Sequence, residues 1–142
     1  MTYVPTKQWA AIGTRINSIR ATTPECVGAK NLLLSLYNAG WEAGGIRFWK
    51  GRDYQYNYNE RGERLGYLRT ERGRIRTNFG DATGWPVPGF LAYDAKAFFA
   101  NPFLPVHEAL HAWFRQTNDP RAAPERTETE ATKAQRGCPA TR

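Results

Sequence analysis

Two histidines four residues apart constrain this chain more than any other feature of its sequence. His107 and His111 are its only histidines, and Glu108 directly follows the first. On a helix, residues four apart lie on the same face, so both imidazoles can reach one metal ion. Glu108 would lie close enough to hold and deprotonate a water at that ion without being a ligand. The run 105–114 is therefore predicted to be a helix with a metal site; the alternative is an amphipathic helix whose glutamate forms an ordinary ion pair.

The length and composition indicate one globular domain. With 142 residues, the chain is long enough for one core and too short for two comfortable ones, so we expect a single domain over 1–142. No apolar run approaches the length that spans a membrane, and we expect no membrane partner. The N-terminal residues do not resemble a signal peptide, which leaves room for a cleaved leader or an upstream domain.

A basic, aromatic segment in the middle of the chain suggests an alternative function. The net charge is +7. Six arginines cluster in this segment: Arg61, Arg64, Arg69, Arg72, Arg74 and Arg76. They could contact phosphates while the tyrosines of 54–58 stack on bases, as in a nucleic-acid-binding or nuclease domain. Since no known nucleic-acid motif accompanies them, we favour a solvated arginine face and do not expect nucleic acid as a partner.

Apolar residues at spacings of three and four predict two helices near the N-terminus. They cover 6–20 and 29–38, with a loop rich in helix breakers over 21–28. Beyond Gly45 the apolar period becomes two, which predicts a short antiparallel meander with its arginines facing solvent. Its strands are expected over 46–50, 54–58, 65–69 and 74–79, with turns at 59–62 and 70–73.

The last third of the chain is expected to place the histidine helix between a strand and a final helix. Residues 84–89 read as a rigid turn, 90–93 as a strand and 94–102 as a linker. A loop over 118–124 should end the histidine helix, and a last helix should run from about Pro124 or Glu125 to Gln135. The predicted fold class is therefore α+β.

The two cysteines lie near opposite ends of the chain. A bridge between Cys26 and Cys138 would tie the C-terminal tail to the first loop and would suit an oxidising compartment. Two separate thiols are the alternative, and the sequence leaves both open.

A catalytic zinc ion needs a third protein ligand from another element. Four acidic residues follow His111: Asp119, Glu125, Glu128 and Glu130. The first two fall in a loop and at a helix start, so the last two are better placed. Residues two apart on a helix point about 200° apart, so only one of these two glutamates can face the metal.

These residues resemble the gluzincins, zinc peptidases in which a second helix supplies a glutamate ligand. The resemblance covers chiefly 90–137 and implies a single zincin-like domain that binds Zn²⁺. Glu128 followed by Thr132 fits the group's pattern of a ligand and a side chain that steadies the first histidine. Glu130 instead fits the spacing of the aminopeptidase-like members. We favour Glu128, with Glu130 as the alternative.

The chain is also similar to small bacterial effector peptidases and to peptidase domains of polymorphic toxins. Tyr93-Asp94 before the motif and Ala112 after it carry this likeness. It implies a domain delivered into a target cell or secreted as part of a larger protein, with a cognate immunity or inhibitor protein as a partner.

The chemistry implied is metal-assisted hydrolysis of an amide bond in a protein or peptide. Glu108 would take a proton from the attacking water and pass it to the leaving amine. Tyr93 could stabilise the developing oxyanion. The competing interpretation of Tyr93 is a half-buried strand aromatic, and the sequence favours this second role.

Overall fold

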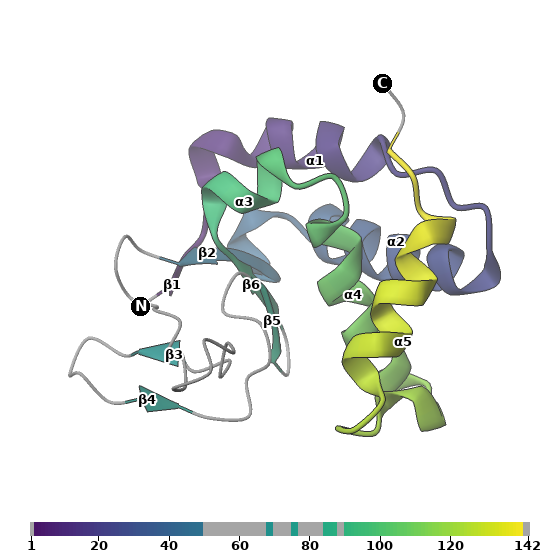
Figure 1. Ribbon diagram of the computed structural model, residues 1–142. Coiled ribbons are helices and arrows are strands. Elements are labelled where there is room, and N and C mark those ends of the chain that lie inside the picture. Colours follow the sequence, from purple (N-terminus) through teal and green to yellow (C-terminus); the bar gives the residue numbers. More distant parts are fainter. Residues whose placement is uncertain (1, 50–67, 70–74, 77–83, 88–89, 141–142) are drawn as a thin grey trace.

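A mixed sheet flanked by helices makes up most of the described structure (Figure 1). The computed structural model describes residues 2–49, 68–69, 75–76, 84–87 and 90–140. Its strands and helices alternate only in part along the chain, which is consistent with the predicted α+β class. None of the described helices is long and apolar enough to cross a membrane.

The main sheet has four strands in the order β1-β2-β6-β5. They are β1 (Thr2–Tyr3), β2 (Ile46–Trp49), β6 (Phe90–Tyr93) and β5 (Gly84–Val87). β2 pairs in parallel with β6, whereas both outer pairs are antiparallel. The strands predicted at 46–50 and 90–93 are thus confirmed, but the placement of the first in an antiparallel meander is wrong. Three of the four β2 residues are buried, as expected for an inner strand rather than a half-solvated one.

A separate two-stranded antiparallel sheet confirms part of the meander. β3 (Leu68–Arg69) pairs antiparallel with β4 (Ile75–Arg76), and these residues belong to the predicted strands 65–69 and 74–79. The predicted strand 54–58 and the turns at 59–62 and 70–73 lie outside the described residues.

β5 occupies residues 84–87 of the turn predicted for 84–89. Its residues pair with β6 in antiparallel register, with Pro86 opposite Leu91. Proline and glycine suggested a turn, but β5 is the last strand of its sheet. An edge strand tolerates proline because its outward side needs no N–H donor.

The N-terminal helices differ from the prediction mainly at their ends. The first is shorter, with a 3-10 turn η1 (Thr6–Gln8) before α1 (Trp9–Asn17). α2 (Pro24–Asn38) begins inside the predicted loop. Thr23 caps it by accepting a hydrogen bond from the backbone N–H of Cys26, and Pro24 suits the first helical turn. The residues taken for loop breakers are therefore a helix start. A short 3-10 turn η2 (Trp41–Ala43) leads towards β2.

The C-terminal half contains the histidine helix and the helices beside it. The linker predicted over 94–102 instead holds a helix, α3 (Ala95–Ala100), whose N-cap Asp94 accepts a hydrogen bond from the N–H of Ala97 at 3.0 Å. α4 (Leu104–Gln116) is the predicted histidine helix. A 3-10 turn η3 (Pro120–Ala122), α5 (Thr127–Ala134) and a final 3-10 turn η4 (Gln135–Gly137) follow.

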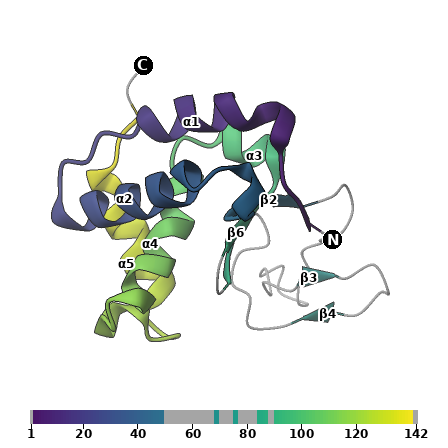
Figure 2. The same ribbon diagram turned by 180° about the vertical axis from the view of Figure 1, so that it is seen from behind.

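α4 lies between α2 and α5 (Figures 1 and 2). Gly28 of α2 lets α2 and α4 approach closely, because a side chain at this position would overlap the indole of Trp113 in α4. The core continues from this contact to the sheet through the large buried residues Leu33, Phe48 and Phe98. α4 is thus held by the core on one side and carries α5 on another.

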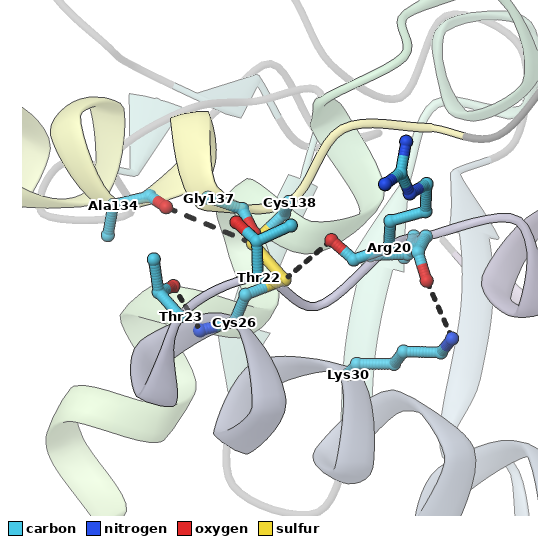
Figure 3. Close-up of a disulfide and its surroundings, with 9 residues drawn as sticks. Arg20, Thr22, Thr23, Cys26, Lys30, Ala134, Gly137 and Cys138 are labelled. Atoms are coloured by element: carbon cyan, nitrogen blue, oxygen red, sulfur yellow. Dashed lines mark hydrogen bonds between the residues drawn. A yellow bond between two sulfur atoms is a disulfide. The ribbon is translucent and has the colours of Figure 1, made fainter.

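Cys26 and Cys138 form a disulfide, which decides between the two alternatives left by the sequence (Figure 3). Their Cα atoms are 5.5 Å apart, and 112 positions separate them in the chain. In the chain-entropy account, closing a loop of this length contributes roughly 4 to 5 kcal/mol to stability.

Candidate metal centre

α4 places both histidines and the intervening glutamate in a nearly closed environment. His107, Glu108 and His111 are 7%, 1% and 9% exposed. Charged or polar residues are seldom buried so deeply unless they are paired or bind a metal. One potential ligand atom from each of the three lies within 4.8 Å of the others, so the group could hold a metal ion.

The two imidazoles converge through their Nε2 atoms, which are 3.2 Å apart. Their far nitrogens are held by α5 and η4. Nδ1 of His107 lies 2.7 Å from Oε1 of Gln135, and Nδ1 of His111 lies 2.6 Å from Oγ1 of Thr127. Where these oxygens accept from Nδ1–H, the neutral ring leaves its Nε2 lone pair available to a metal.

Glu128 is the acidic side chain that the structure brings to these nitrogens. Its Oε1 lies 2.9 Å from Nε2 of His107, and its Oε2 lies 3.3 Å from Nε2 of His111. Hydrogen bonds with the two histidines lower the pKa of the Glu128 carboxyl well below its usual range. Glu130 instead lies near the cations of Arg126 and Lys133, at 3.9 and 3.8 Å. The geometry thus favours Glu128 over Glu130.

The donor set and its spacing fit a divalent metal. Where Nδ1 of His107 donates to the Gln135 carbonyl, a neutral ring leaves a lone pair on Nε2, and a hydrogen bond from Nε2 to Glu128 needs a second proton on the ring. A single proton could satisfy only one of the contacts among the two Nε2 atoms and the Glu128 carboxylate. A single cation between them would interact favourably with all three groups. Ligand atoms around a tetrahedral zinc ion lie about 3.3 Å apart for bonds of about 2.0–2.1 Å. The observed separations of 2.9, 3.2 and 3.3 Å are close to this value.

Glu108 belongs to the group that could hold a metal ion, but its carboxylate lies farther from the His107 imidazole than that of Glu128. Its Oε2 is 3.9 Å from Nε2 of His107, whereas the carboxylate of Glu128 lies 2.9 Å from the same nitrogen. That separation suits a carboxylate that contacts a water at the ion rather than the ion itself.

Tyr93 lies in the core. It is fully buried, and its hydroxyl donates a 2.7 Å hydrogen bond to the carbonyl of Pro105 in the first turn of α4. Burial, and then the charge of Glu108, raise the pKa of this phenol well above its usual range, so it stays a neutral donor. Tyr93 is thus a strand aromatic, as the sequence favoured, but it is fully rather than half buried, and its hydroxyl contacts the first turn of α4.

Asp119 is bound elsewhere. Its carboxylate accepts hydrogen bonds from Arg121, and they lower its pKa to about 2. Arg121 also reaches Glu25 of α2 at 3.3 Å. Asp119 thus joins a polar contact between η3 and α2. Glu125 is exposed and lies just before α5.

Sequence reasoning missed both residues that hold the histidine rings. Thr132, predicted to steady the first histidine, lines the adjacent cavity, while Gln135 makes that contact. Gln135 follows Glu128 by seven positions, which is two helical turns and therefore the same face. That spacing could have revealed it. Thr127 directly precedes Glu128, so helical spacing does not place these two residues on the same face and gives no reason to select Thr127.

A cavity of about 350 Å³ opens on the His107 side of the cluster. It lies between the start of α4 and the exposed side of α5. It is lined by Asn101, Phe103, Leu104, His107, Glu128, Thr132 and Gln135. A ligand in this cavity would touch His107 and Glu128 directly.

Removing either ring partner is expected to weaken metal binding. Gln135→Ala or Thr127→Val frees Nδ1 of one histidine, and loss of such outer partners typically costs about 10- to 100-fold in affinity. Zinc affinity measured by competition with a chromophoric chelator checks this. Thr132→Ala is the matched control on the same helix and should stay within about twofold; equal losses in all three variants would contradict the assignment.

Tyr93→Phe is expected to lower stability by about 1 kcal/mol, because it removes one buried hydrogen bond to α4. The turnover of any hydrolysis should change little. Loss of an oxyanion donor would instead cost about 10²- to 10³-fold in kcat. Denaturant unfolding and steady-state kinetics of the same variant separate these outcomes.

The chain matches no family model, no curated protein and no solved structure.

Proposed function

We propose that the protein is a zinc-dependent endopeptidase. The observation that carries this proposal is the convergence of two imidazoles and the Glu128 carboxylate beside a buried Glu108. Two histidines, one carboxylate and a separate glutamate make up the donor set and base of hydrolytic zinc sites. A zincin-like arrangement of the domain, with α4 and α5 carrying the ligands, belongs to the same proposal.

The proposed reaction assigns a distinct role to each side chain. His107, His111 and Glu128 would hold Zn²⁺, which when bound acts as a Lewis acid on a substrate carbonyl and makes water easier to deprotonate. Glu108 accepts a proton from the attacking water and donates it to the leaving amine. Gln135 and Thr127 keep the imidazole nitrogens pointed at the site. A substrate side chain would lie in the cavity between α4 and α5.

We further propose that this peptidase works outside a reducing cytosol, as a secreted or delivered toxin or effector domain. The disulfide supports this, because such bonds persist in oxidising compartments and are rare in the cytosol. A cognate immunity or inhibitor protein would then be a natural partner.

The direct test is cleavage of a peptide library by the purified protein, read by mass spectrometry. We expect hydrolysis that stops when a chelator removes the metal and returns when zinc is restored. A matched sample of His107→Ala/His111→Ala should cleave nothing. Cleavage that survives complete metal removal would contradict the proposal, and so would its persistence in the double variant.

A further inference from the structure

The helix that carries Glu128 has little apolar surface to hold it in place. α5 has eight residues, and only Ala131 among them is buried. Helices this short are not stable by themselves in water, and a buried alanine contributes little hydrophobic free energy. The position of α5 therefore depends on the polar contacts at the histidines and on what holds its two ends.

The C-terminal end of this helix is fastened to the start of α2. Directly after η4, Cys138 forms the disulfide with Cys26 (Figure 3). Next to it, the carbonyl of Gly137 accepts hydrogen bonds from the N–H and from the hydroxyl of Thr22, both at 2.9 Å. We call this set of contacts the clasp.

The clasp is closely packed and leads back to the histidine helix. A side chain at Gly137 would overlap the side chain of Thr23, so the tail lies directly on the cap of α2. A 2.7 Å hydrogen bond from the N–H of Arg20 to the carbonyl of Pro139 extends it. Because α2 packs on α4, the clasp fixes α5 relative to the histidines through the core.

We propose that formation of the Cys26–Cys138 disulfide completes the metal site. This inference rests on the proposed metal site, and it adds a requirement for oxidation. Without the bond, the segment bearing Thr127, Glu128 and Gln135 is free to move away from α4, so the third ligand and both ring partners are less often in place. The reduced chain therefore binds zinc more weakly than the oxidised chain.

The oxidation is a thiol–disulfide exchange with a small-molecule or protein disulfide. The two cysteine thiols and R–S–S–R give the Cys26–Cys138 bond and two R–SH, so two electrons and two protons pass to the oxidant. Both cysteines are fully buried in the product. A reductant reaches them only when the tail opens, so the bond acts as a maturation step rather than as a rapidly reversible switch.

The test compares three forms of the whole chain: the oxidised protein, the protein reduced with a phosphine, and Cys26→Ala/Cys138→Ala. A phosphine avoids zinc-binding thiol reagents, and the double variant excludes zinc binding by the freed thiols. Zinc dissociation constants come from chelator competition, and hydrogen exchange of the metal-free forms reports on α5 and α4 separately. The double variant with and without phosphine is the control for effects of the reagent.

We expect zinc binding to weaken by at least about tenfold in both disulfide-free forms. This is the lower end of the loss in affinity that follows removal of a residue that orients a metal ligand. The amides of α5 should exchange at least about tenfold faster while those of α4 remain protected. Zinc affinities and α5 exchange within twofold of the oxidised protein would overturn the proposal. So would loss of α4 protection in both forms, because the disulfide would then hold the whole fold rather than the ligand segment.

These readouts are separate from hydrolysis. If zinc binding depends on the disulfide in this way but the oxidised protein cleaves no peptide, the proposed peptidase activity is refuted. The proposal that the disulfide completes the metal site is then still supported. An oxidised protein that binds no zinc would overturn both.

Discussion

Glu108→Gln is expected to leave zinc binding and stability close to those of the wild type while turnover falls by about 10²- to 10⁴-fold, the usual contribution of general acid–base catalysis. The amide fills the same buried space beside His107 but cannot accept a proton from the attacking water. The carboxylate lies 3.9 Å from that imidazole, against 2.9 Å for Glu128, so we expect it to be dispensable for holding the metal. Steady-state kinetics check the expected loss of turnover, and metal analysis of the same preparation checks the expected retention of zinc.

Two different results would contradict the role given to Glu108. Near-wild-type hydrolysis by Glu108→Gln would show that Glu108 is not the base. Loss of zinc from the variant would instead show that this carboxylate is a ligand. Glu108→Asp is a useful companion, because it keeps the charge but withdraws the carboxylate by one methylene group, and we expect partial activity.

Glu128→Ala is expected to lower zinc affinity by more than the 10- to 100-fold that removal of an outer partner costs. It takes away the carboxylate that lies within 3.3 Å of both imidazole nitrogens. Hydrolysis should disappear with the metal. Glu130→Ala is the matched control two residues away, and we expect it to change stability by no more than about 0.5 kcal/mol with no loss of zinc.

The opposite ranking would overturn this assignment. If Glu130→Ala lost the metal and Glu128→Ala kept it, the aminopeptidase-like spacing would be correct. If both variants retained zinc at wild-type affinity, the third ligand would have to be sought elsewhere, first at Asp119 and Glu125.

More of the candidate metal site than of the fold around it could be predicted from the sequence. Helical periodicity alone brings His107 and His111 to one face. Because Glu128 and Glu130 point about 200° apart on a helix, only one of them can face the histidines. The partners of the imidazole rings depend on how α5 docks on α4. Thr132 was expected next to the first histidine, yet the docking of the two helices brings Gln135 there instead.

The errors in the fold have local physical causes. Pro24 and Pro86 were interpreted as breakers, but one begins a helix behind a threonine cap and the other lies in an edge strand, where each is tolerated. The parallel pairing of β2 with β6 joins segments far apart in sequence, and no local pattern encodes such a partner. Whether Cys26 and Cys138 form a bridge or stay as two thiols is likewise not encoded locally, because it depends on the fold bringing them together.

The most direct test of the metal centre is X-ray absorption at the zinc edge of the oxidised protein loaded with one equivalent of zinc. We predict a four-coordinate ion with two imidazole nitrogens and two oxygens at about 2.0–2.2 Å, one oxygen from Glu128. The signal of one imidazole should vanish in His111→Ala. A sulfur shell at about 2.3 Å, a spectrum without imidazole, or failure to bind one equivalent would contradict the site described for this protein.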